Sequence, residues 1–258
     1  EDEAWTRSLV VNRLKVPLVP RVFFMDREFH GLGEPDSPRR ILEAGQSMDD
    51  LVGFVLQQFT QQHDLQSPVT WIDQTPKNCI AALEFLQWRP QARFIHLLRD
   101  GRDVMLSLAR RWAREAPGHP PSTYLGAACA RWTFDVAQAR RASEQPGYLE
   151  ITYEDLVHHP LRTLNQILEH LKRPAITQSQ LDHHQSPSAV AAGERFHGGR
   201  KQTWGAQPGQ AIQTTGVGRW KNQLPGPLLD KLRPLVFDVP GDDRRYCFGE
   251  QLQACGYV

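Results

Sequence analysis

The sequence lacks any long apolar run. No stretch of about 20 consecutive apolar residues occurs, which is the length that a membrane-spanning helix requires. The chain opens with EDEAWTRS, which is acidic and differs from the basic and apolar pattern of a secretory leader. We therefore expect a cytoplasmic protein that has no membrane partner.

The sequence also lacks an excess of charge of either sign. Its 30 lysines and arginines nearly balance 29 aspartates and glutamates, which leaves a formal net charge of +1. Nucleic-acid-binding proteins usually present a strongly basic surface, so we expect no nucleic-acid partner. An anion-binding site in this chain has to be built locally from a few arginines.

Patterns of metal ligands are missing as well. The 10 histidines show no HExxH or comparable spacing, and we predict no metal. The four cysteines, Cys79, Cys129, Cys247 and Cys255, are too few and too far apart for a secreted disulfide scaffold. We interpret them as free thiols in a reducing compartment, with a Cys247–Cys255 disulfide as the alternative.

What the sequence contains is a repeated pattern of a strand followed by a helix. Strand-like runs at Val69–Ile72, Phe94–Leu98 and from Tyr148 each precede a helical pattern, and a longer helix is expected at Thr123–Ala142. The helical patterns after the strands cover Asn78–Trp88, the residues up to Trp112, and Leu161–Leu171. This alternation predicts a single α/β domain over residues 1–258, in three layers, with a central parallel sheet and helices on both faces.

A long segment without apolar periodicity interrupts this pattern. Residues 193–218 contain seven glycines and several basic residues. A compact domain rarely keeps a loop of this length unless the loop has a function. We therefore predict a lid loop at 193–218.

The stretch FIHLLRDGRDVMLS, Phe94 to Ser107, places basic residues where a strand meets a helix. Ligands bind beyond the carboxyl ends of the strands in open α/β sheets, so Arg99 is expected at the ligand edge. Gly101 permits a tight turn, and Asp103 is predicted to cap a helix that begins at Val104. Ser107 and Arg111 follow Asp103 at four-residue steps on one helix face.

These donors suit a phosphate monoester, because an arginine can bind two oxygens at once and a helix N-terminus favours anions. The alternative is a surface cluster of salt bridges that only caps the helix. That cluster would consist of Arg99, Asp100, Arg102 and Asp103. Spacing alone leaves both interpretations open.

Four segments in order resemble the sulfotransferases that use 3′-phosphoadenosine 5′-phosphosulfate (PAPS). They are WIDQTPKN (71–78), RDGRDVMLS (99–107), ITYEDLVHHP (151–160) and VGRWKNQL (217–224). The last is followed by the family's terminal pair, here Gly256-Tyr257. The chain is most similar to the bacterial branch that is related to tyrosylprotein sulfotransferases.

The resemblance implies a fold like that of P-loop NTPases, and it implies sulfuryl transfer as the reaction. A sulfuryl group would pass from PAPS to a hydroxyl or amine of a small-molecule or peptide acceptor, and adenosine 3′,5′-bisphosphate would leave as the product. It also implies roles for residues at matching positions. Arg99, Ser107 and Arg111 would hold the 3′-phosphate, Tyr153 would approach the nucleotide, and Arg219 would close over the phosphates beside Trp220, a hydrophobic anchor of the lid.

The sequence departs from the family in two places. The family begins with a strand and a PxSGTT-like phosphate loop, and residues 1–258 contain no counterpart of either. We therefore interpret the chain as N-terminally incomplete, with its first strand missing. The alternative is a complete chain with a degenerate site. Gln74 stands where the family has a lysine that would stabilise charge on the leaving oxygen, although Lys77 could reach in from the next turn. These departures support a second hypothesis, a catalytically inactive nucleotide-binding or interaction module.

A catalytic base is expected near the start of the chain. Related tyrosylprotein enzymes place a glutamate shortly after the first helix, and Glu1 or Glu3 falls near that place. The alternative is that both glutamates are solvated terminal charges.

Overall fold

The computed structural model describes residue 72 and residues 76–182, 212–239 and 242–257. The chain divides into two compact units, Glu1–Ala81 and Ala82–Val258. The first unit is described only at Ile72 and at the 3-10 helix η2 (Pro76–Ala81). The described helices and strands other than η2 all belong to the second unit, and the single domain over residues 1–258 stays a prediction.

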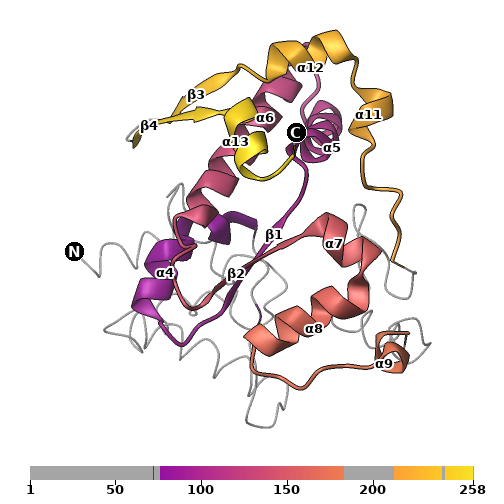
Figure 1. Ribbon diagram of the computed structural model, residues 1–258. Coiled ribbons are helices and arrows are strands. Elements are labelled where there is room, and N and C mark those ends of the chain that lie inside the picture. Colours follow the sequence, from indigo (N-terminus) through magenta and orange to yellow (C-terminus); the bar gives the residue numbers. More distant parts are fainter. Residues whose placement is uncertain (1–71, 73–75, 183–211, 240–241, 258) are drawn as a thin grey trace, which may run out of the picture. The chain divides into compact units, whose positions relative to one another are not determined.

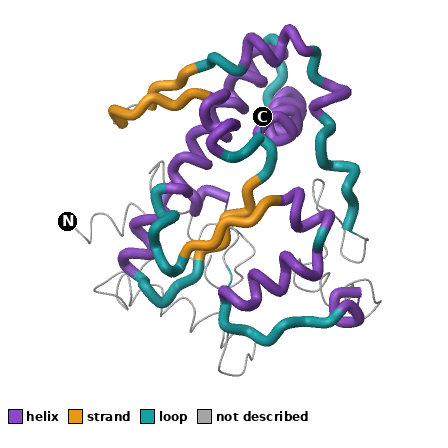
Figure 2. The backbone as a smooth tube through the Cα atoms, viewed as in Figure 1, coloured by secondary structure: helices purple, strands orange, loops and turns teal. Residues whose placement is uncertain are grey.

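Two parallel strands lie at the centre of this unit (Figures 1 and 2). Strand β1 (Phe94–Leu98) pairs with β2 (Tyr148–Thr152), and the register runs from Phe94 opposite Tyr148 to Leu98 opposite Thr152. Both strands begin where the sequence pattern places them. The parallel pair, with a helical connection between its strands, confirms the predicted α/β class.

Helices flank the two strands, and those at residues 82–88, 101–115, 121–140 and 160–170 come in the predicted order. They are α4 (Ala82–Trp88), α5 (Gly101–Glu115), α6 (Pro121–Arg140), α7 (Tyr153–His158), α8 (Pro160–His170) and α9 (Gln178–Asp182). Proline at the first position of α6 and α8 explains why each begins earlier than the apolar spacing suggests, because proline fits the first helical turn. In Figure 1, α8 lies on the side of the strand pair away from α6.

The C-terminal part adds elements that the sequence pattern did not predict. These are α11 (Trp220–Gln223), α12 (Gly226–Leu232), the antiparallel hairpin of β3 (Val236–Val239) and β4 (Asp242–Cys247), and α13 (Phe248–Ala254). All four cysteines are free, so the alternative disulfide between Cys247 and Cys255 is not formed. Burial raises the pKa of the Cys129 thiol to about 12, which keeps that thiol protonated.

The main hydrophobic core joins α5 and α6 to the C-terminal helices. Trp132 of α6 packs edge to face on Phe248 of α13, with ring centroids 5.7 Å apart, and Met105 of α5 is fully buried beside them. Leu98, the last residue of β1, belongs to the same core. The core therefore holds the carboxyl end of β1 rigidly against the start of α5.

Candidate anion-binding site

The connection from β1 to α5 is shorter than the sequence pattern suggests. Helix α5 begins at Gly101, and its N-cap is Asp100, whose carboxylate accepts the backbone N–H of Arg102 at 2.9 Å. The prediction that Asp103 caps a helix starting at Val104 is wrong, because Asp100 already binds the free amide of the first turn. Asp103 thereby becomes available for other partners.

Gly101 is required by packing rather than by a tight turn. A Cβ atom at this position would lie 2.7 Å from two ring carbons of Trp132, which is closer than real Cβ atoms approach. The indole Nε1–H of Trp132 in turn donates to the backbone oxygen of Arg99 at 3.0 Å. Trp132 therefore supports the backbone from which the Arg99 side chain extends.

Arg99 lies at the carboxyl end of β1, as predicted. Its guanidinium donates to the backbone oxygen of Gly216 and stands over the ring of Tyr153, 4.5 Å from the ring centroid. Its Nε–H is buried and has no acceptor in the described part of the structure. Two predicted site residues, Arg99 and Tyr153, are therefore brought into contact.

Arg219 also carries a buried Nε–H that has no acceptor in the described ranges. It occupies the N-cap position of α11 and follows Gly218, whose φ of 69° lies in the left-handed region that favours glycine. A buried donor without a partner usually costs about 1–3 kcal/mol. Two such donors on two guanidinium groups could both bind an anionic acceptor.

The other two predicted phosphate ligands lie on α5. Ser107 is exposed, one helical turn beyond Asp103. Arg111 is half-buried, and its Nε donates to Glu115 at 2.7 Å, one turn further along the same helix. The structure thus brings Arg99 and Tyr153 together and places Ser107 on the open face of α5. The Nε of Arg111 is engaged within the helix.

Of the predicted surface salt-bridge cluster, the described part of the structure shows the pair of Arg102 with Asp100. Arg102 pairs with Asp100 at 2.9 Å, but both side chains are buried. The Arg102 guanidinium also covers the ring of Trp220, 3.8 Å from its centroid. Trp220 packs against the main core, in agreement with its expected role as a hydrophobic anchor.

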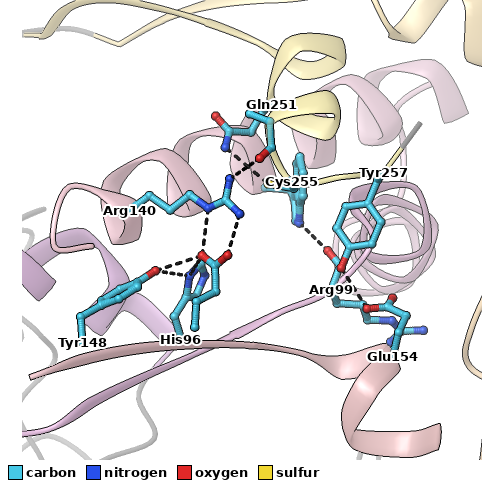
Figure 3. Close-up of polar contacts among 11 residues, drawn as sticks. His96, Arg99, Arg140, Tyr148, Glu154, Gln251, Cys255 and Tyr257 are labelled. Carbon is cyan, nitrogen blue, oxygen red and sulfur yellow. Dashed lines mark hydrogen bonds and ion pairs between the residues drawn. The ribbon is translucent and has the colours of Figure 1, made fainter. Parts of the chain in front are cut away.

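The C-terminal tyrosine reaches this region from the far end of the chain. Tyr257 donates its hydroxyl hydrogen to Glu154 at 2.9 Å, and the second carboxylate oxygen of Glu154 accepts the backbone N–H of Asp100 at 3.1 Å (Figure 3). Burial, together with the negative charge of Glu154, raises the pKa of Tyr257 above its usual range. The sequence analysis assigned no role to Glu154. Two signals were nevertheless at hand, because Glu154 directly follows Tyr153 in the motif ITYEDLVHHP and its partner Tyr257 belongs to the terminal Gly256-Tyr257 pair.

A second polar cluster lies where β2 faces α6 (Figure 3). Glu150 accepts hydrogen bonds from Arg140 at 2.6 and 2.9 Å and from Tyr148 at 3.0 Å, and His96 lies 3.0 Å away. Arg140 also donates to the backbone oxygen of Ala254 at 2.8 Å. Burial alone raises the pKa of Glu150, but the hydrogen bonds from Arg140 and His96 outweigh it and hold this pKa well below its usual range. This cluster therefore joins the sheet to α13, just before Tyr257.

Several predicted features lie outside the described residues. They are Glu1, Glu3, Gln74, the side chain of Lys77, and residues 193–211 of the predicted lid loop. The end of that loop, residues 212–218, is described and contacts Arg99 through Gly216. Among the described helices none is long and apolar enough to cross a membrane, and the described residues contain no group of three metal-ligating side chains.

The fold and the site together define a class of protein. Arg99 directly follows the first of two parallel strands, and Arg99 and Arg219 each keep a buried Nε–H without an acceptor in the described ranges, an arrangement that suits an anion at the carboxyl edge of the sheet of an α/β protein. Residues 30–177, more than half of the chain, match the family model described as the sulfotransferase family. The chain therefore belongs to the sulfotransferase family, and it is a transferase of that general class.

Among solved structures, the chain is similar to a sulfotransferase domain from the curacin biosynthetic pathway, with 17% sequence identity and a TM-score of 0.43. The similarity covers 86% of this chain and 74% of that domain. The search of the curated proteins found no match.

Proposed function

We propose that this protein transfers a sulfuryl group from PAPS to a hydroxyl or amine acceptor, a small molecule or a peptide. The observation that supports this proposal is a pair of half-buried arginines, Arg99 and Arg219, that each keep a buried Nε–H without an acceptor in the part of the chain that the structure describes. A phosphate group of the nucleotide would supply the missing acceptors. The family assignment supports the sulfuryl chemistry.

The residues of this chain would act by holding the nucleotide in place. Arg99 would bind a phosphate oxygen while Tyr153 supports its guanidinium from one face. Arg219 would add a second cation from the segment that follows the predicted lid loop. PAPS, when bound, supplies the activated sulfuryl group, so these side chains need only orient it and balance its negative charge.

An inactive nucleotide-binding or interaction module is the second candidate function. It is favoured by Gln74, which lacks the charge of the lysine found at this position in the family, and by the lack of a phosphate loop in residues 1–258. Such a module would bind adenosine 3′,5′-bisphosphate through Arg99 but would not turn over PAPS. Binding and turnover therefore have to be measured separately.

The test of the proposal is calorimetric titration with adenosine 3′,5′-bisphosphate. Arg99→Ala removes charge-assisted hydrogen bonds and should weaken binding by about 2–4 kcal/mol, or roughly 30-fold to 1,000-fold. Arg114→Ala is the matched control, because it removes an exposed arginine from the last turn of α5, the helix that follows Arg99. A folded wild-type protein that does not bind the nucleotide would contradict the proposal.

Transfer of radiolabelled sulfate from PAPS to a mixed panel of phenols, alcohols, amines and tyrosine peptides then separates the two candidates. Turnover on any acceptor favours the enzyme. Nucleotide binding without hydrolysis or transfer favours the module.

A further inference from the structure

Asp103 is a fully buried carboxylate in the first turn of α5. It accepts the backbone N–H of Gly218 at 2.6 Å through one oxygen and the backbone N–H of Trp220 at 2.9 Å through the other. Neither contact is local, because the partners lie 115 and 117 residues further along the chain. Asp103 therefore ties the start of α5 to the residues that flank Arg219.

Burying a carboxylate is costly unless hydrogen bonds and nearby positive charge compensate it. The N-terminal turn of α5 supplies part of that positive charge, and the two N–H groups supply the hydrogen bonds. No cationic side chain in the described residues pairs with Asp103. Its charge is therefore balanced largely by backbone groups of the 216–220 segment. The carboxylate holds this segment in place, and the N–H groups of the segment make the burial of the carboxylate possible.

Two further residues of the same stretch hold this segment. Arg99 donates to the backbone oxygen of Gly216, and Arg102 covers the ring of Trp220. Between them, Gly218 adopts a left-handed conformation that leaves its N–H directed at Asp103. The segment 216–220 is thus held at both ends and in the middle by residues 99–103.

We propose that Asp103 is a positioning residue that holds the backbone on both sides of Arg219, so that this arginine can bind the nucleotide together with Arg99. Asp103 itself does not touch the nucleotide. This inference rests on the proposed function, because it concerns the same anion site. It predicts that Asp103 affects nucleotide affinity only through Arg219.

A double-mutant cycle tests this dependence. The variants are Asp103→Asn, Arg219→Ala and their combination, with Asp230→Asn, an exposed aspartate of α12, as the matched control. An asparagine keeps the shape, but its NH₂ group faces one of the two N–H donors, so at least one charge-assisted hydrogen bond is lost. We expect each single variant to weaken binding of adenosine 3′,5′-bisphosphate by about 10-fold to 100-fold.

The combined variant decides the outcome. If Asp103 acts through Arg219, the combination binds hardly more weakly than Arg219→Ala alone. A merely structural role would instead make the two losses multiply. Multiplied losses, or a folded Asp103→Asn variant that binds like the wild type, would overturn the proposal.

Amide hydrogen exchange of the wild-type protein gives a test that needs neither ligand nor mutation. The N–H groups of Gly218 and Trp220 should exchange slowly, because a buried carboxylate accepts both. Fast exchange at both amides would refute the positioning role even if Asp103→Asn fails to fold. Slow exchange without any nucleotide binding would instead contradict the proposed function and leave the tie between Asp103 and this segment intact.

Discussion

Gly101→Ala is the substitution whose effect follows most directly from the structure. The new Cβ atom would lie 2.7 Å from two ring carbons of Trp132 and 2.9 Å from a third, all of them on a buried and rigid indole. The backbone of Gly101 does not have a positive φ, so alanine meets no conformational strain there. The steric contact with Trp132 is therefore the main effect.

The magnitude follows from two opposing contributions. Overpacking a core position usually costs about 1–3 kcal/mol. Alanine in place of glycine in a helix usually gains up to about 1 kcal/mol, and less at the first helical position. Displacement of Trp132 also weakens its hydrogen bond to the backbone oxygen of Arg99, which is worth about 1 kcal/mol. We expect a net loss of about 1–3 kcal/mol in the free energy of unfolding.

The assay is urea unfolding followed by titration with adenosine 3′,5′-bisphosphate. Gly126→Ala in α6 is the matched control, because a Cβ atom there meets nothing within 4 Å and should stabilise the protein by about 0.5–1 kcal/mol. Gly101→Ala should also bind the nucleotide more weakly, since the Arg99 backbone moves with Trp132. If both substitutions stabilise the protein equally and leave binding unchanged, the packing account of Gly101 is refuted.

Two further predictions concern the polar contacts around the sheet. Glu150→Gln should lower the free energy of unfolding by about 1–3 kcal/mol at neutral pH. The pKa of Glu150 is lower in the folded than in the unfolded protein, so the stability difference between wild type and Glu150→Gln should shrink as the pH falls below about 4.3. A stability difference that stays constant with pH would contradict this prediction. An equal loss of stability in the exposed control Glu144→Gln would also contradict it. Tyr257→Phe should cost about 1 kcal/mol in urea unfolding at neutral pH. Because the pKa of Tyr257 is higher in the folded than in the unfolded protein, the stability that its hydroxyl contributes should be lost progressively as the pH rises above about 10. A Tyr257→Phe variant as stable as the wild type would show that the contact with Glu154 does not form.

The order and type of the main elements could be predicted from the sequence. The strands at Phe94–Leu98 and from Tyr148, and the helices that follow them, depend on local apolar periodicity, which a linear sequence carries in full. The position of Arg99 at the ligand edge follows from the same pattern, because the carboxyl ends of parallel strands share one edge. The anchoring role of Trp220 was also predicted, from its place beside a basic motif.

The detailed site could not be predicted in the same way. Asp103 looked like a helix cap, because capping is the commonest local role of an aspartate near the start of a helix. Which of two nearby aspartates caps α5 is decided by where the chain turns into the helix, and in the structure that turn falls at Asp100, next to Gly101 and its close contact with Trp132. The hairpin of β3 and β4 was missed, since both strands are short and β4 is rich in charge.

The sequence by itself determined the α/β class, the strand β1 and the position of Arg99 at the carboxyl end of that strand, because these depend on local patterns of residues. Only the tertiary structure decided the partners of Asp103, Arg99 and Glu154. Gly218, Gly216 and Tyr257, the respective partners, lie more than 100 residues away in the chain. The packed core of α5, α6 and the C-terminal helices brings these distant groups together. The spacing of residues in the sequence therefore does not reveal which distant amide, carbonyl or hydroxyl group a buried side chain contacts.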